Sequence, residues 1–279
     1  MEVRPNIDVL CMHKGASTFV AAELFPSIAK LTDQYTTYNL DRLFVDWFTQ
    51  IKDEIGFEPT NDWKVISKRL ELMFKYYPMP KTNGLIGRLY PNHIPAVSQY
   101  LQEEFPPRNA KVFVMRRDPR DALVSQYFSH AYSHNPKALE TKTKNFGSQR
   151  SRIQEIGVKT WLKDTLEDTR YGGVVSEFNS CIDILNSHKN VIDMPYELLI
   201  NHPRRWLNRF VRAAKLEDIV TDQWYDEMEK NLTPPTEVDK MKHKRRMRPG
   251  NWRQYFDDEL KSMLDTQIGD RLVQYQYTW

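Results

Sequence analysis

The chain has 279 residues, of which 40% are hydrophobic, 28% charged and 12% aromatic. This balance is that of a folded protein with a buried core, and it excludes disordered, collagen-like and coiled-coil chains. No apolar run approaches the roughly 18 residues that cross a bilayer, and the first residues lack the apolar segment of an export signal. We therefore expect a cytoplasmic protein without a membrane anchor.

The positive charge is concentrated in one segment. Residues 240–253 contain seven Lys or Arg and no acid, whereas the whole chain has a net charge of only +3. A local basic patch favours a compact anionic ligand over a long polyanion, although charge alone leaves a solvated basic loop equally open. The two cysteines, Cys11 and Cys181, are too few for a disulfide framework or a zinc cluster, which favours a reducing compartment.

The predicted elements alternate between strands and helices. Short apolar runs that indicate buried strands lie at 7–12, 35–40, 85–89, 112–115 and 191–194. Amphipathic stretches that indicate helices run from Ser17 or Thr18 to Leu31 and over 43–55, 63–76, 119–132, 158–166 and 174–185. This order predicts an α/β fold in a single domain over residues 1–279, with a mainly parallel central sheet flanked by helices. Loops are predicted at 133–152 and 232–250.

The first strand leads into a loop suited to an anion. Met12-His-Lys-Gly-Ala-Ser-Thr-Phe19 combines small residues, a lysine and two hydroxyls just before a helix that Ser17 or Thr18 can cap. Small residues let the backbone wrap around an oxyanion, and helix N-terminal amides point at it. Because Lys14 precedes Gly15, the order differs from that of a Walker A loop. An ordinary capped connection between strand and helix is the alternative.

A second pattern suited to a phosphate follows the strand at 112–115. Arg116-Arg-Asp-Pro-Arg-Asp-Ala-Leu-Val-Ser125 places Arg117 just before a helix that Asp118 caps, with Ser125 two turns further on. A guanidinium and a hydroxyl could meet on one phosphate there. Taken alone, the pattern fits surface arginines paired with the neighbouring aspartates better.

Together the two segments resemble the sulfotransferases that use 3′-phosphoadenosine 5′-phosphosulfate (PAPS). Lys14-Gly-Ala-Ser-Thr-Phe19 is similar to their Lys-x-Gly-Thr-Thr-Trp loop, and Arg117-Asp-Pro-Arg-Asp-Ala-Leu-Val-Ser125 looks like their Arg-Asn-Pro-Arg-Asp-x-x-x-Ser motif. Looser similarities lie at Pro195-Tyr-Glu197 and at Arg245-Arg-Met-Arg-Pro-Gly-Asn-Trp-Arg253. In the last segment Met247 stands where the family has glycine, and Asn251 where it has aspartate.

The resemblance implies an enzyme that moves a sulfuryl group from PAPS to a small-molecule acceptor, with no metal and with no nucleic-acid or membrane partner. It assigns the 5′-phosphosulfate to Lys14, Gly15, Ala16, Ser17 and Thr18. It assigns the adenine to Phe19 and Tyr196, and the 3′-phosphate to Arg117, Ser125, Arg245 and Arg246. Lys14 is expected to stabilise the leaving phosphate, because sulfuryl transfer depends mainly on positioning and cations. The sequence leaves open the acceptor, its hydroxyl or amine group, and the oligomeric state.

The acceptor also needs a base. Cytosolic members of the family supply a histidine in a Lys-Thr-His context after a central strand. That triplet is absent here. After the comparable strand, at 85–89, the nearest histidine is His93 in Arg88-Leu-Tyr-Pro-Asn-His93. A histidine that caps the following helix is an equal alternative. His13, His130 and His134 are further candidates, although histidines near bound anions often only pair with them.

Two other classes of function stay open. One is a small-molecule kinase that uses ATP, which the order of residues in the first loop and the Arg117 and Ser125 pair both disfavour. The other is a nucleic-acid-binding protein that uses residues 240–253, for which steep salt dependence is expected.

Overall fold

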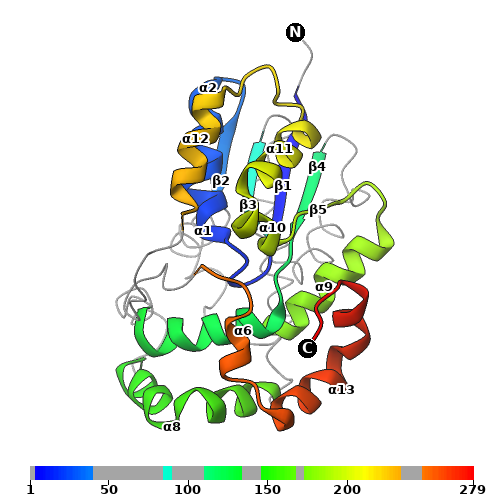
Figure 1. Cartoon of the computed structure of the whole chain (residues 1–279). Coiled ribbons are helices and arrows are strands. Elements are labelled where there is room, and N and C mark those ends of the chain that lie inside the picture. Colours follow the sequence, from blue (N-terminus) through cyan, green and yellow to red (C-terminus); the bar gives the residue numbers. More distant parts are fainter. Residues whose placement is uncertain (1–3, 40–83, 90–109, 134–145, 168–172, 234–246) are drawn as a thin grey trace, which may run out of the picture.

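A five-stranded sheet forms the centre of the protein. The computed structural model describes residues 4–39, 84–89, 110–133, 146–167, 173–233 and 247–279 (Figure 1). The strands are β1 (Asn6–Cys11), β2 (Thr36–Asn39), β3 (Gly84–Leu89), β4 (Ala110–Met115) and β5 (Ile192–Asp193), in the spatial order β2-β3-β1-β4-β5. All neighbouring strands are parallel, which confirms the predicted α/β sheet and its five strands.

Helices connect these strands and follow the last of them. In the first part of the chain they are α1 (Ser17–Phe19), the π-helical η1 (Val20–Leu24), α2 (Phe25–Leu31), α6 (Pro119–Phe128), the π-helical η3 (Ser129–Ser133) and α8 (Phe146–Glu167). In the second part they are α9 (Val174–Ser187), α10 (Tyr196–Asn201), α11 (Pro203–Ala214), α12 (Asp222–Asn231), the 3-10 helix η5 (Asn251–Gln254) and α13 (Asp258–Gln274).

Most predicted helices are confirmed, and one predicted loop is partly wrong. The stretches at 119–132 and 174–185 are helical, and 158–166 is the end of the longer α8. Because α8 begins at Phe146, the loop prediction for 133–152 fails over its last residues. The predicted helices at 43–55 and 63–76 lie outside the described residues. The prediction of one domain over 1–279 stays a prediction.

The core lies on both faces of the sheet, because successive strand residues point to opposite sides. Leu10, Val112 and Val114 pack in a core with α6, α8, α9 and α13, whereas Ile7 and Phe113 pack in a second core with α2, α11 and α12. In Figure 1, α2, α11 and α12 gather at the end of the view near the N-terminus, and α6, α8 and α13 at the opposite end. Burial on both faces explains why the strands are continuous apolar runs.

The carboxyl ends of β1 and β4 lie side by side. Cys11 pairs with Met115 at the last position of both strands. The chain leaves β1 toward β2 and leaves β4 toward β5, in opposite directions across the sheet. The space beyond such a switch point is where open α/β sheets bind ligands. Both anion-binding segments predicted from the sequence follow these two strands.

No helix in the described parts of the chain is both long and apolar enough to span a bilayer.

Candidate functional site

The loop after β1 has the backbone of an anion cradle. Lys14 and Ala16 have positive φ angles of 62° and 72°. Between them, Gly15 packs so closely that a Cβ would lie 2.9 Å from the carbonyl oxygen of Met12. Left-handed residues that alternate with right-handed ones turn successive N–H groups toward one point, where they can bind an anion. The loop is therefore suited to a phosphate or sulfate.

The helix after the loop starts without a side-chain cap. Ala16 is the N-cap residue of α1, and its methyl side chain makes no capping hydrogen bond. The predicted cap at Ser17 or Thr18 is therefore wrong, because the positive φ of Ala16 carries the chain directly into the helix and puts Ser17 in its first turn. The first N–H groups of the helix then keep their capacity to bind an anion.

Three contacts hold the main chain of the loop, two from distant parts of the chain and one from Cys11, four residues before Gly15. They are the hydrogen bond from His13 N–H to the Glu177 carboxylate, that from Arg117 Nη1 to the Lys14 carbonyl (2.8 Å) and that from Cys11 Sγ to the Gly15 carbonyl (3.0 Å). Each contact engages the backbone of the loop and not the side chains of Lys14, Ser17 or Thr18.

The side chain of Lys14 reaches the end of α6. Its Nζ donates a hydrogen bond to the Ser129 hydroxyl over 2.7 Å. Ser129 is buried and lies one helical turn beyond Ser125, the serine that the sequence motif indicated. The sequence analysis missed Ser129, although a second hydroxyl four residues along the same helix was a signal that could have found it.

Arg117 connects the segment after β4 to the Lys14 loop. Its guanidinium carbon is 4.2 Å from the centre of the Tyr196 ring, and its Nη1 holds the Lys14 carbonyl. Arg117 is only 6% exposed, and its Nε has no hydrogen-bond partner within the described chain. A buried donor without a partner costs about 1–3 kcal/mol. The orphaned Nε therefore fits an anionic group that a ligand supplies, such as a phosphate.

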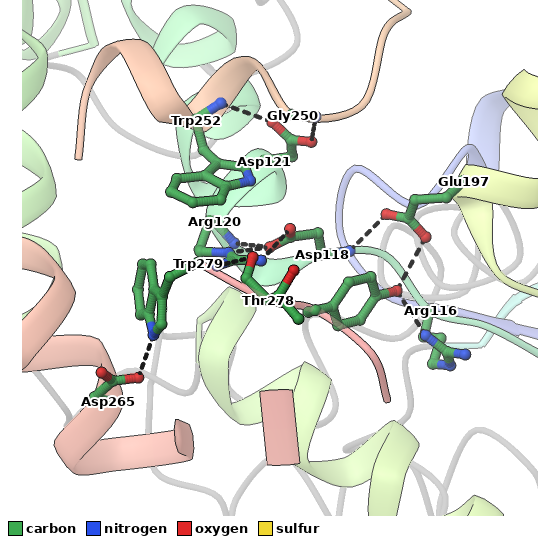
Figure 2. A network of polar contacts seen from close by, with 11 residues as sticks. Arg116, Asp118, Arg120, Asp121, Glu197, Gly250, Trp252, Asp265, Thr278 and Trp279 are labelled. Carbon is green, nitrogen blue, oxygen red and sulfur yellow. Dashed lines mark hydrogen bonds and ion pairs between the residues drawn. The ribbon is translucent and has the colours of Figure 1, made fainter. Parts of the chain in front are cut away.

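The neighbours of Arg117 are buried and paired (Figure 2). Arg116 binds the Asp193 carboxylate through two hydrogen bonds of 2.9 and 2.8 Å and donates to the Tyr277 hydroxyl over 2.6 Å. Glu197 accepts hydrogen bonds from Asp118 N–H and from the Tyr277 hydroxyl. The alternative of arginines on the surface is therefore wrong for this segment.

Arg120 joins the start of α6 to the end of the chain. It is 1% exposed and binds Asp118 through Nε and Nη2, at 2.9 and 2.8 Å. Its Nη1 donates to the Thr278 carbonyl, and its guanidinium carbon lies 3.9 and 4.6 Å from the ring centres of Trp252 and Trp279 (Figure 2). The guanidinium of this buried ion pair thus packs against two tryptophan rings.

Asp121 fixes the chain that follows the basic segment. Its carboxylate accepts hydrogen bonds from the N–H groups of Gly250 (2.6 Å) and Trp252 (2.9 Å) (Figure 2). The carboxylate thereby holds residues 250–252 against α6, the helix that carries Ser125. Arg245 and Arg246, expected at the 3′-phosphate, lie outside the described residues.

Of the remaining predicted site residues, some are described by the structure and others lie outside the described residues. Phe19 is buried with its ring edge against Trp206, and Tyr196 is buried with its ring against Arg117. Their contacts with adenine stay predictions. His130 lies in η3, where its ring packs edge-on against Trp161. His93 and His134 lie outside the described residues.

Burial raises the pKa of Glu177 to about 7, against an ordinary value near 4.5. Between pH 4.5 and 7 the folded state therefore holds a proton that the unfolded state has released. The free energy of unfolding falls as the pH rises through this range, and the stabilisation is lost once the pH passes 7. We expect wild-type protein to lose about 2 kcal/mol between pH 5 and 8 relative to Glu177→Gln, measured by urea unfolding at both pH values. An equal pH dependence of the two proteins would contradict the raised pKa.

The protein has a parallel sheet, a loop with positive φ angles after β1 and a buried arginine beside that loop, all at the switch point of the strand order. A sequence model described as the sulfotransferase domain matches residues 46–276, so the chain belongs to this family of enzymes, which use PAPS. The matched region includes the Arg117 segment and begins after the Lys14 loop.

One solved sulfotransferase structure is similar in fold, and two further solved structures match with lower TM-scores. Mouse sulfotransferase SULT7A1, crystallised with 3′-phosphoadenosine 5′-phosphate (PAP), matches with a TM-score of 0.53 and 16% identity over 96% of this chain and 84% of that one. Retinol dehydratase with androsterone and PAP gives 0.45 and 14% over 98% and 82%. Sulfotransferase STF9 from Mycobacterium avium gives 0.46 and 12% over 100% and 78%. No curated protein sequence matches significantly.

Proposed function

We propose that this protein transfers the sulfuryl group of PAPS to a hydroxyl or amine of a small-molecule acceptor by in-line displacement. The observation that carries the proposal is the cradle with positive φ at Lys14 and Ala16, 2.8 Å from the guanidinium of a buried arginine whose Nε lacks a partner in the described chain. A ligand with two separate anionic groups fits such an arrangement, since the loop and Arg117 can each bind one.

The proposal gives the two segments different roles. Lys14, Gly15, Ala16, Ser17 and Thr18 bind the 5′-phosphosulfate. Arg117 and Ser125 bind the 3′-phosphate, together with Arg245 and Arg246 from the basic segment. Phe19 and Tyr196 lie at the adenine. This division rests on the resemblance of the motifs, and it is supported by the orphaned Nε of Arg117.

The chemistry requires a cation at the leaving group and a base at the acceptor. PAPS supplies the sulfuryl group, whose bond to the 5′-phosphate oxygen breaks as the acceptor atom bonds to sulfur, and PAP leaves. The ammonium of Lys14 stabilises the negative charge that develops on the leaving phosphate. The hydroxyl of Ser129 holds this ammonium in the free enzyme. His93 takes the proton of the acceptor.

His93→Ala is expected to lower kcat by about a hundredfold or more at saturating PAPS, with nearly unchanged affinity for PAP. Wild-type kcat should rise with pH through an apparent pKa of about 6–7, because the imidazole must be neutral to accept a proton. The measurement is a pH profile of both proteins, with His202→Ala as a control at an exposed histidine between α10 and α11. Normal turnover of His93→Ala would move the role to another group, with His130 next.

The proposed function is tested by product analysis. Purified protein is incubated with PAPS and a panel of alcohols, phenols and amines, and PAP and sulfated products are measured by mass spectrometry. The proposal predicts acceptor-dependent release of PAP with an equal amount of sulfated acceptor. Release of ADP from ATP in the presence of the same acceptors, without turnover of PAPS, would overturn it in favour of a kinase.

A further inference from the structure

Glu177 is a buried carboxylate that touches the first residues of the cradle. It lies on α9, is 8% exposed, and accepts the hydrogen bond of His13 N–H through Oε2. Its Oε1 lies 3.8 Å from Nδ1 of the same histidine. The contact joins residues 164 positions apart in the sequence. Glu177 therefore fixes the main chain directly before Lys14.

This carboxylate has fewer hydrogen-bond donors than three other buried carboxylates near the site. The other buried carboxylates near the site have several donors: Asp118 accepts from Arg120 three times, Asp121 from Gly250 and Trp252, and Glu197 from Asp118 and Tyr277. In the described residues, Glu177 has one hydrogen-bond donor, the His13 N–H. A buried charge with so little compensation is costly. The hydrogen bond from His13 N–H gives this buried carboxylate a role in the loop.

The contact supports a strained backbone. Lys14, the next residue, has a φ of 62°, a conformation that residues with a Cβ adopt at an energetic cost. Such a conformation persists where surrounding contacts determine it. Glu177 holds the peptide group between Met12 and His13, and Arg117 holds the peptide group that follows Lys14.

We propose that Glu177 is a positioning residue of the Lys14 loop, and that its carboxylate takes up one proton from solvent when the loop binds an anion. The inference rests on the proposed function, because it takes residues 14–18 as the site of the 5′-phosphosulfate. A protonated carboxyl still accepts the His13 hydrogen bond through its carbonyl oxygen, so the loop keeps its shape.

Electrostatics explains the proton uptake. A carboxylate and a bound anion on the same short loop repel one another strongly in a medium of low dielectric constant. A proton on Glu177 removes this repulsion. Because the pKa of the buried carboxyl is already about 7, protonation near neutral pH requires little free energy.

Among the residues described, no lysine or arginine forms an ion pair with Glu177, and Lys14 of the same loop directs its ammonium to Ser129. His13 faces Glu177 from the loop, and Cys181 follows it by one turn, where burial raises the pKa of the thiol well above its ordinary value. The cations from adjacent elements are engaged elsewhere: Arg116 with Asp193, Arg120 of α6 with Asp118 and Arg271 of α13 with Asp183. Cys11 of β1, the remaining ionisable group near Cys181, is a buried thiol.

The test compares PAP binding by wild type, Glu177→Gln and Glu177→Ala at pH 6, 7 and 8. Glutamine keeps an oxygen acceptor for His13 N–H and has no charge. We expect the ratio of the wild-type to the Glu177→Gln dissociation constant to rise about tenfold from pH 6 to pH 8. This ratio cancels the titration of the phosphates of PAP. Glu177→Ala lacks the acceptor and should bind PAP at least about tenfold more weakly than Glu177→Gln at every pH.

Calorimetry in two buffers with different ionisation enthalpies gives the independent readout. At pH 8 wild type should take up close to one proton more than Glu177→Gln on binding PAP. The control is Glu155→Gln, the same change at an exposed position of α8, which should behave as wild type.

The outcomes separate the claims. A ratio that does not change with pH, or equal proton uptake by both proteins, would overturn the titration of Glu177. Equal PAP affinity of Glu177→Ala and Glu177→Gln would overturn its positioning role, and a Glu177→Ala protein that fails to fold leaves the pH ratio and calorimetry of Glu177→Gln to decide. Wild-type protein that binds PAP no more tightly than AMP would overturn the proposed function itself, together with this inference.

Discussion

Lys14→Ala is expected to lower kcat by about a hundred- to a thousandfold, while the dissociation constant of PAP rises by less than about tenfold. The ammonium matters most when negative charge develops on the leaving phosphate, so its loss affects the transition state more than the bound product. In the free enzyme this ammonium is held by Ser129 at 2.7 Å, at the end of α6.

The measurement is steady-state turnover of PAPS combined with PAP titration by calorimetry. Lys30→Ala, at an exposed lysine near the end of α2, is the control and should leave both constants unchanged. Equal losses of rate and of PAP affinity in Lys14→Ala would show that the lysine binds without preference for the transition state, even if the site is correct.

Arg120→Ala is expected to destabilise the protein by about 3–5 kcal/mol. Arg120 is buried, and its removal leaves the Asp118 carboxylate without its ion pair in the interior. It also removes the group that packs against the rings of Trp252 and Trp279, which leaves a cavity. The free energy of unfolding in guanidinium chloride measures the effect.

Arg204→Ala is a matched control for this prediction. Arg204 of α11 also has several acidic partners, including Asp226 and Glu229, but its side chain is 41% exposed. Solvent screens such pairs, so we expect a loss below about 1 kcal/mol. Similar losses in Arg120→Ala and Arg204→Ala would contradict the view that burial makes the Arg120 pair essential.

The sequence predicted the parts of the site that are local. The strand before Lys14, the strand before Arg117 and the cap at Asp118 each depend on residues close together in the chain, and the structure confirms them. Parallel strands place such segments at one edge of a sheet. That β1 and β4 are neighbours is a property of the strand order, which no local pattern contains.

The parts that could not be predicted depend on long-range packing. The contact of Glu177 with His13 and that of Asp121 with Gly250 join segments that no spacing rule connects. The positive φ of Ala16 also has no signal in the sequence, since alanine rarely adopts it. In contrast, α11 could have been predicted, because Trp206, Phe210 and Ala214 recur at helical spacing and are buried.

The central claim is that one ligand with two anionic groups binds across the ends of β1 and β4. Calorimetric titration with PAP and with AMP, which lacks the 3′-phosphate, tests it most directly. We predict a PAP dissociation constant in the micromolar range or below, which corresponds to about −8 kcal/mol, and an affinity for AMP at least about tenfold weaker. In Arg117→Ala, the preference for PAP over AMP should become smaller, because one of the groups that bind the 3′-phosphate is lost. Equal affinities of PAP and AMP for the wild-type protein would contradict the account.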